Sequence, residues 1–119
     1  HNMFNKKFTM LTHANVNNMY TSNHLQKGTL VRYRFSDYSI IDYGLDMTDN
    51  EWHYGIISET HWYINMSDMF GRHALNIYEV PHEECVCYDL SVHNMSLAVK
   101  EMINIDLYEI QVLIPKESE

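Results

Sequence analysis

The stretch Trp52–Met66, WHYGIISETHWYINM, constrains the fold of this chain more than any other segment. Two runs rich in aromatic and β-branched residues flank the short polar segment Ser58–Thr60, a pattern typical of a β-hairpin. Folding about that segment places His53 opposite Asn65 on one face. The other face is apolar and belongs to the core, and cross-strand pairs on it stabilise a sheet: Trp52 with Met66, Tyr54 with Ile64, Ile56 with Trp62.

The remaining segments predict further strands and one helix. Leu30–Phe35 alternates between apolar and basic residues, which indicates a half-buried strand. Leu107–Ile114 alternates again, and Ala74–Val80 and Cys85–Leu90 have strand composition. Ser91–Ile103 has apolar residues three or four apart, which predicts a helix. We therefore expect an α+β domain, a small antiparallel sheet or barrel with one packed helix.

The charge of the chain is unevenly distributed. The formal net charge is −8 over 119 residues. All sixteen acidic residues lie after residue 34, whereas the first 34 residues hold five of the eight basic ones: Lys6, Lys7, Lys27, Arg32 and Arg34. We expect a basic polar N-terminal arm over residues 1–27 and one domain over residues 28–119. The arm lies against the acidic body or is free to bind an anionic membrane, while the net charge disfavours nucleic acid.

Two cysteines, Cys85 and Cys87, are too close in sequence to staple a fold, which favours a reducing compartment. No secretory signal pattern opens the chain and no apolar run is long enough for a membrane span, so we expect a cytoplasmic location. The cysteine and histidine residues lack the usual spacing of a zinc site, and the sequence has no Gly-rich phosphate loop. We therefore expect no metal and no cofactor.

Three segments resemble the lecithin:retinol acyltransferase-like (LRAT-like) branch of the NlpC/P60 superfamily. They are Gly28–Tyr33, His53–Ile56 and the polar turn with its second strand. Those domains open with a glycine and a hydrophobic strand, and they carry an H-box of the type His-Trp/Tyr-Ala/Gly-Ile. A second polar residue follows at the end of the next strand, a place that Asn65 fits. The resemblance covers roughly residues 28–114. It implies a papain-like layout and a kinship with cellular acyltransferases and picornavirus H-box/NC proteins.

The sequence departs from this family at the nucleophile. The family's cysteine stands in an Asn-Cys-Glu-His-Phe-like motif after a tyrosine, and no such motif occurs here. Tyr108 matches that tyrosine, but Leu113–Pro115 follows it. A thiol hydrolase needs a thiolate, a histidine base and a group that fixes the imidazole tautomer. His53 and Asn65 match the last two roles, and Cys85 and Cys87 are the only thiols.

These observations leave three functions open. The first is a degenerate LRAT-like domain, a pseudoenzyme that binds a host or viral protein. The second is an active thiol hydrolase or acyltransferase on lipid or acyl substrates, which uses Cys85 or Cys87 with His53. The third is an SH3-like interaction module unrelated to that family.

Overall fold

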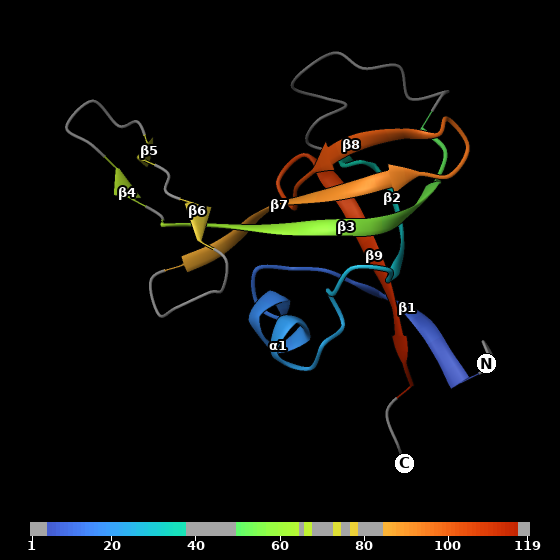
Figure 1. Cartoon of the computed structure of the whole chain (residues 1–119), viewed down its shortest axis with the longest axis horizontal. Helices are drawn as coiled ribbons and strands as arrows, with labels where there is room; N and C mark the ends of the chain where they lie inside the picture. The colour runs from blue at the N-terminus through green and yellow to red at the C-terminus, as the bar shows by residue number, and fades with distance from the viewer. Residues whose placement is uncertain are drawn as a thin grey trace.

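The computed structural model describes residues 5–37, 50–64, 66–67, 73–74, 77–78 and 85–116, with side chains over 5–37, 50–62 and 89–116. These residues form a small antiparallel sheet with one short helix, an α+β arrangement (Figure 1). The elements are β1 (Lys6–Met10), α1 (Val16–Thr21), β2 (Leu30–Phe35), β3 (His53–Ile64), β4 (Met66–Ser67), β5 (His73–Ala74), β6 (Ile77–Tyr78), β7 (Cys85–Asn94), β8 (Val99–Ile103) and β9 (Tyr108–Pro115).

The strands follow the order β1-β9-β2-β3-β7-β8 across the main sheet, with β6 beside β3. The short strands β4 and β5 form a separate pair. Two predicted strands are confirmed, since β2 covers Leu30–Phe35 and β9 covers nearly all of the second alternating segment. The segments predicted as strands at 74–80 and 85–90 contain β6 and the first part of β7. The sequence also predicts a short strand at Tyr38–Tyr43, and this segment lies outside the described residues.

The predicted hairpin in Trp52–Met66 is wrong. β3 runs without a turn from His53 to Ile64, and β7 is its antiparallel partner. Ser58–Thr60 lacks the glycine or asparagine that a tight turn requires. The sheet accommodates the polar segment by a register shift between Ile57 and Glu59. There the Ser58 hydroxyl donates to the Ser91 carbonyl oxygen at 3.1 Å.

The predicted helix Ser91–Ile103 is wrong as well. β7 continues to Asn94, a turn follows, and β8 returns antiparallel to it. The Asn94 side-chain oxygen accepts hydrogen bonds from the backbone N–H groups of Ser96 and Leu97, both at 2.9 Å. Ala98 then takes a positive φ of 56°. A side chain that satisfies its own following backbone competes with helix formation, which explains the turn.

The described part of the expected N-terminal arm packs within the same unit. β1 pairs with β9, and a short helix is present as α1. Figure 1 shows α1 beside the long strands, and Tyr20 meets Trp62 edge-on at 4.9 Å between ring centroids. The residues of the segment that are buried in the core are Leu11, Val16, Met19 and Leu25. Among the described residues no helix is long and apolar enough to cross a membrane.

At the start of β3 the two faces are opposite to those predicted, whereas Trp62, which follows the register shifts, is fully buried as predicted. Ile57 is 1% exposed and Gly55 is buried, so the odd-numbered positions at this end face the core. Tyr54, expected in the core, is 40% exposed. Gly55 is required there, because a Cβ would come within 2.9 Å of the His93 carbonyl oxygen on β7.

Candidate functional site

The structure does not bring the predicted catalytic residues together. His53 begins β3, and Asn65, which lies outside the described residues, directly follows the last residue of that strand. At about 3.3 Å of rise per residue, the two ends of β3, His53 and Ile64, are about 36 Å apart along the strand. β3 therefore does not form the predicted hairpin that would set His53 opposite Asn65.

The two cysteines lie near the far end of β3 from His53. Cys85 pairs with Ile64 and Cys87 pairs with Trp62 in the β3–β7 ladder. Trp62 stands nine positions along the strand from His53, or about 30 Å. A thiolate and its base must be within hydrogen-bond reach, so these cysteines and His53 do not form a catalytic pair.

His53 instead lies beside a buried polar network. Its ring centroid is 5.9 Å from that of Tyr33 on β2. The Asn94 side-chain amide donates to the Tyr33 hydroxyl at 3.0 Å and to a Glu101 carboxylate oxygen at 2.7 Å. Tyr108 packs edge-on against Tyr33 at 6.1 Å. The network joins strands β2, β7, β8 and β9 at one end of the sheet.

The environment of this network changes the acidity of two tyrosines. Burial, with the Glu101 charge adding to it, raises the pKa of Tyr33 to about 12 even though the hydrogen bond from Asn94 acts in the opposite direction. Burial and the same carboxylate also raise the pKa of Tyr108. Both phenols are therefore neutral near pH 7, where a general base would need a pKa close to the working pH.

A pocket of about 190 Å³ opens beside the network. Its size falls below the range usual for ligand sites, which begins at about 300 Å³. Aromatic rings make up much of its wall, and Phe35 stacks on Tyr108 at 5.0 Å. The lining residues are Tyr33, Arg34, Phe35, Asn50, His53, Leu97, Glu101 and Tyr108. Neutral phenols around a small hollow suit a structural role better than proton transfer.

The predicted basic residues separate into two groups. Arg32 lies over the rings of Phe8 and Trp52, at 4.4 and 4.7 Å from their centroids, and Arg34 lies over Trp52 at 4.3 Å. Arg34 also pairs with Glu109 at 2.6 Å. These two guanidinium groups are engaged inside the molecule, largely by aromatic faces.

Lys6 and Lys27 make up the second group, because both line a larger cavity near the start of β2. Lys7 is exposed and is not part of that wall. Among the residues that the structure describes, no group of three or more His, Cys, Asp or Glu side chains gathers as a metal site would require.

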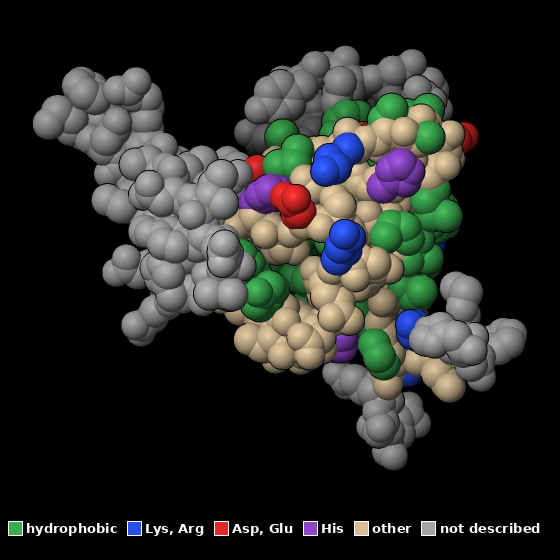
Figure 2. Space-filling model, viewed as in Figure 1, with side chains coloured by type: hydrophobic (Ala, Val, Ile, Leu, Met, Phe, Trp, Pro, Cys, Tyr) green, Lys and Arg blue, Asp and Glu red, His purple; other side chains and the backbone are tan. Residues whose placement is uncertain are grey.

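Exposed apolar side chains concentrate on β8 and on the turn before it. Leu97 is 62% exposed and Met95 is 56% exposed, both in the turn. On β8, Met102 is 48% and Val99 is 47% exposed. Figure 2 shows hydrophobic side chains along the upper edge of the described surface, where β8 and its turn lie in Figure 1. Sequence reasoning missed this surface because it assigned Met95, Val99 and Met102 to the apolar stripe of a helix.

Compared with known proteins, the chain matches no family model, no curated protein and no solved structure. Function is therefore inferred from the burial, contacts and charges of the described residues.

The residues that sequence reasoning missed are Asn94 and Glu101. An asparagine followed by Met-Ser-Leu-Ala is a turn signal that could have marked Asn94.

Proposed function

We propose that this protein acts by binding, and that its partner is an extended segment of another protein that adds to the sheet beside β8. The observation that carries the proposal is the combination of a sheet edge with exposed apolar side chains. Large apolar side chains left in solvent beside one another mark interaction sites in soluble proteins.

The position of β8 supports strand addition. β8 ends the path of the main sheet, and among the described strands it pairs with β7 alone. The outer side of an edge strand presents backbone donors and acceptors to any extended chain. A partner strand would gain main-chain hydrogen bonds there, while pockets for alternate side chains would provide selectivity.

The turn that leads into β8 supports the proposal because it is well anchored. Asn94 is fully buried, and its side-chain oxygen holds the N–H groups of Ser96 and Leu97. The Met95 N–H donates to the Tyr54 carbonyl oxygen at 2.9 Å, which ties the turn to β3. A surface already fixed in its bound shape loses less entropy on association.

The same proposal includes a non-catalytic role. The separation of Cys85 and Cys87 from His53 removes the geometric basis of the thiol-hydrolase alternative. Kinship with the LRAT-like H-box domains remains part of the proposal. His53–Ile56 is a strand segment, as that family requires, whereas the expected family helix at 91–103 is replaced by β7, a turn and β8. An interaction module without that kinship would use β8 in the same way.

A library of random peptides displayed on phage, selected on the immobilised protein, tests the binding role while the natural partner is unidentified. We expect enriched peptides with alternating apolar residues, and we expect their amide chemical-shift changes to map to β7 and β8. The double variant Met95→Glu/Leu97→Glu should abolish binding, because both side chains are exposed and their replacement leaves the core intact. The double variant Asn17→Glu/Asn18→Glu, at two exposed positions of α1, is the matched charge control.

A selection that enriches no peptide, or shift changes confined to strands other than β7 and β8, would contradict the proposal. The non-catalytic part has a separate test. Alkylation of Cys85 and Cys87 by iodoacetamide should proceed at the same rate in the wild type and in His53→Ala. A rate that drops several-fold in the variant would show that His53 activates a thiol.

A further inference from the structure

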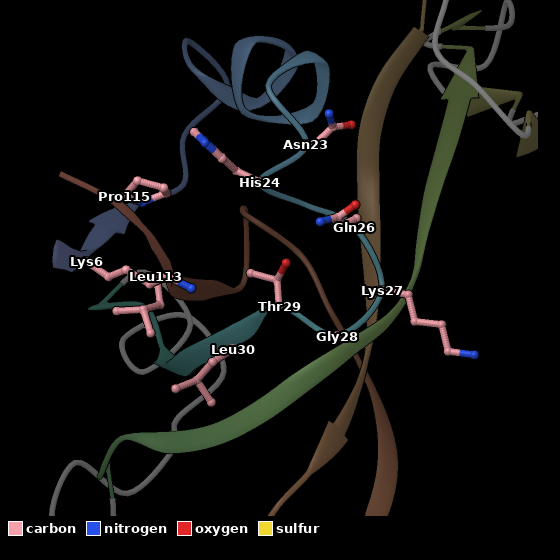
Figure 3. Close-up of a pocket in the computed structure, with 10 residues that line it drawn as sticks. All are labelled: Lys6, Asn23, His24, Gln26, Lys27, Gly28, Thr29, Leu30, Leu113 and Pro115. Atoms are coloured by element: carbon pink, nitrogen blue, oxygen red, sulfur yellow. The ribbon is translucent and has the colours of Figure 1, made fainter. Parts of the chain in front are cut away.

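A second surface feature has chemistry that the proposed protein contact does not use. A cavity of about 490 Å³ lies between the paired ends of β1 and β9 and the loop that joins α1 to β2. From its charge, its free donors and its rigid wall, we propose that this cavity binds the phosphate group of a small organic phosphomonoester. Figure 3 shows Lys6 from β1 beside the hollow with His24 and Thr29 from the loop between α1 and β2, and Lys27 extending away from it.

The wall of the cavity is basic in an acidic protein. Lys6, Lys27 and His24 line it, and no carboxylate belongs to its ten lining residues. The whole chain carries a formal charge of −8, so a wall that holds lysine and no carboxylate runs against the composition. Local positive potential in a concave site raises the local concentration of an anionic ligand.

The donors of this wall are not used within the fold. In the part of the chain that the structure describes, the ion pairs involve other residues than Lys6, His24 and Lys27. The side chains of Gln26 and Thr29 likewise make none of the described hydrogen bonds. Lys6, His24 and Thr29 are half-buried, so an anion that met them would be partly removed from water, where charge-assisted hydrogen bonds are strong.

The loop that carries most of these donors is fixed in place. The Gly28 N–H donates to the Ile57 carbonyl oxygen at 2.8 Å, and the Ile57 N–H donates to the Thr29 carbonyl oxygen at 2.9 Å. Leu25 is 1% exposed, and its carbonyl oxygen accepts a hydrogen bond from the Thr60 hydroxyl at 3.0 Å. The site is therefore formed before any ligand arrives, which lowers the entropic cost of binding.

The remaining lining residues indicate what kind of anion fits. Leu30, Leu113 and Pro115 add an apolar surface, and the cavity volume lies within the range of small-molecule sites. A phosphate has three acceptor oxygens for the ammonium, hydroxyl and amide donors, one more than a carboxylate offers. A polyanion such as nucleic acid would meet the net negative charge of the rest of the chain. These features favour a phosphate on a compact organic body.

The experiment is a titration of the full chain with phenyl phosphate, inorganic phosphate and benzoate at constant ionic strength, read by the amide chemical shifts of Gly28 and Thr29. We expect saturable shifts, with phenyl phosphate bound more tightly than inorganic phosphate and than benzoate. Lys6→Gln should weaken phenyl phosphate binding about ten-fold, because it removes a charge-assisted hydrogen bond. Lys100→Gln, on β8, carries the same charge change outside the cavity and should weaken it less than about two-fold.

Three results would overturn the proposal: no saturable shift with any probe, tighter binding of benzoate, or equal weakening by Lys6→Gln and Lys100→Gln. Tighter binding of a short oligothymidylate through the same amides would instead identify a nucleic-acid site and also overturn it.

Vesicles that contain phosphatidic acid distinguish the source of the phosphomonoester. If the protein sediments with these vesicles and Lys6→Gln does not, the phosphomonoester is a lipid headgroup. If the protein binds phenyl phosphate but does not sediment with the vesicles, the ligand is a free phosphomonoester. Lys6→Gln and Lys100→Gln should both unfold at the wild-type thermal midpoint.

Discussion

The side-chain amide of Asn94 donates a 3.0 Å hydrogen bond to the hydroxyl of Tyr33, and both side chains are almost completely buried. The two residues are 61 positions apart in the sequence. Asn94 also holds Glu101 and the backbone of the following turn. One side chain thereby connects the core at β2 to the turn that carries the proposed binding surface.

Asn94→Ala should destabilise the fold by about 2–4 kcal/mol, because it leaves the Tyr33 hydroxyl and Glu101 without their buried partner and frees two backbone N–H groups. Urea unfolding followed by tryptophan fluorescence measures this. Asn17→Ala, at an exposed helix position, should change the free energy of unfolding by less than about 0.5 kcal/mol. Equal effects of the two variants would show that the Asn94 network adds nothing to stability.

Stability should fall at alkaline pH through Tyr33. Its pKa is raised from 10.0 to about 12 in the folded chain, so the folded state holds the phenolic proton more tightly than the unfolded state does. The resulting stabilisation is complete below pH 10 and is lost as the pH rises through 12, by up to about 2 kcal/mol. Unfolding midpoints measured from pH 9 to 12 should therefore decrease in the wild type.

Tyr33→Phe is the control for this pH dependence. The variant lacks the titrating phenol, so its free energy of unfolding should decline less steeply from pH 9 to 12 than that of the wild type. In a phenolate absorbance titration, Tyr33 and Tyr108 should also ionise after the exposed tyrosines, because burial raises the pKa of both. A wild type and a Tyr33→Phe variant with parallel stability curves would refute the role of Tyr33.

Substitutions of Gly55 and Gly28 should both be destabilising, for different reasons. At Gly55 a new Cβ would meet the His93 carbonyl oxygen at 2.9 Å, so Gly55→Ala forces β3 and β7 apart at a cost of about 2 kcal/mol. At Gly28 the space is open but φ is 97°, so Gly28→Ala costs about 1 kcal/mol of backbone strain. Chemical denaturation compares them. Gly55→Ser should be worse than Gly55→Ala, whereas Gly28→Ser should match Gly28→Ala.

The aromatic contact of Arg34 should contribute more to stability than its ion pair. The pair with Glu109 is partly exposed, so Glu109→Gln should cost less than about 1 kcal/mol. Arg34→Ala also removes the guanidinium from the face of Trp52 and should cost about 1–2 kcal/mol. A double-mutant cycle with Trp52→Ala measures the stacking energy. A coupling energy near zero between Arg34 and Trp52 would contradict this assignment.

The sequence by itself determined the strands in which the alternation of apolar and polar residues is compatible with one type of secondary structure. Most of Leu30–Phe35 and of Leu107–Ile114 alternates between apolar and polar residues. β2 and β9 are strands there because each buries one face, with Val31, Ile110 and Val112 nearly inaccessible. An alternating pattern with charged outward positions fits a half-buried strand and no other element.

The tertiary structure decided the parts where the local pattern permits two solutions. Ser58–Thr60 has the composition of a turn between apolar runs, but β7 pairs with β3 on both sides of a bulge, so the strand continues. The apolar spacing in Ser91–Ile103 suits a helix, yet pairing with β3 and the capping of the turn by Asn94 favour two strands. The site residues follow from those pairings. The distance between His53 and the cysteines, and the partners of Asn94, depend on hydrogen bonds between segments far apart in the chain, which no local periodicity records.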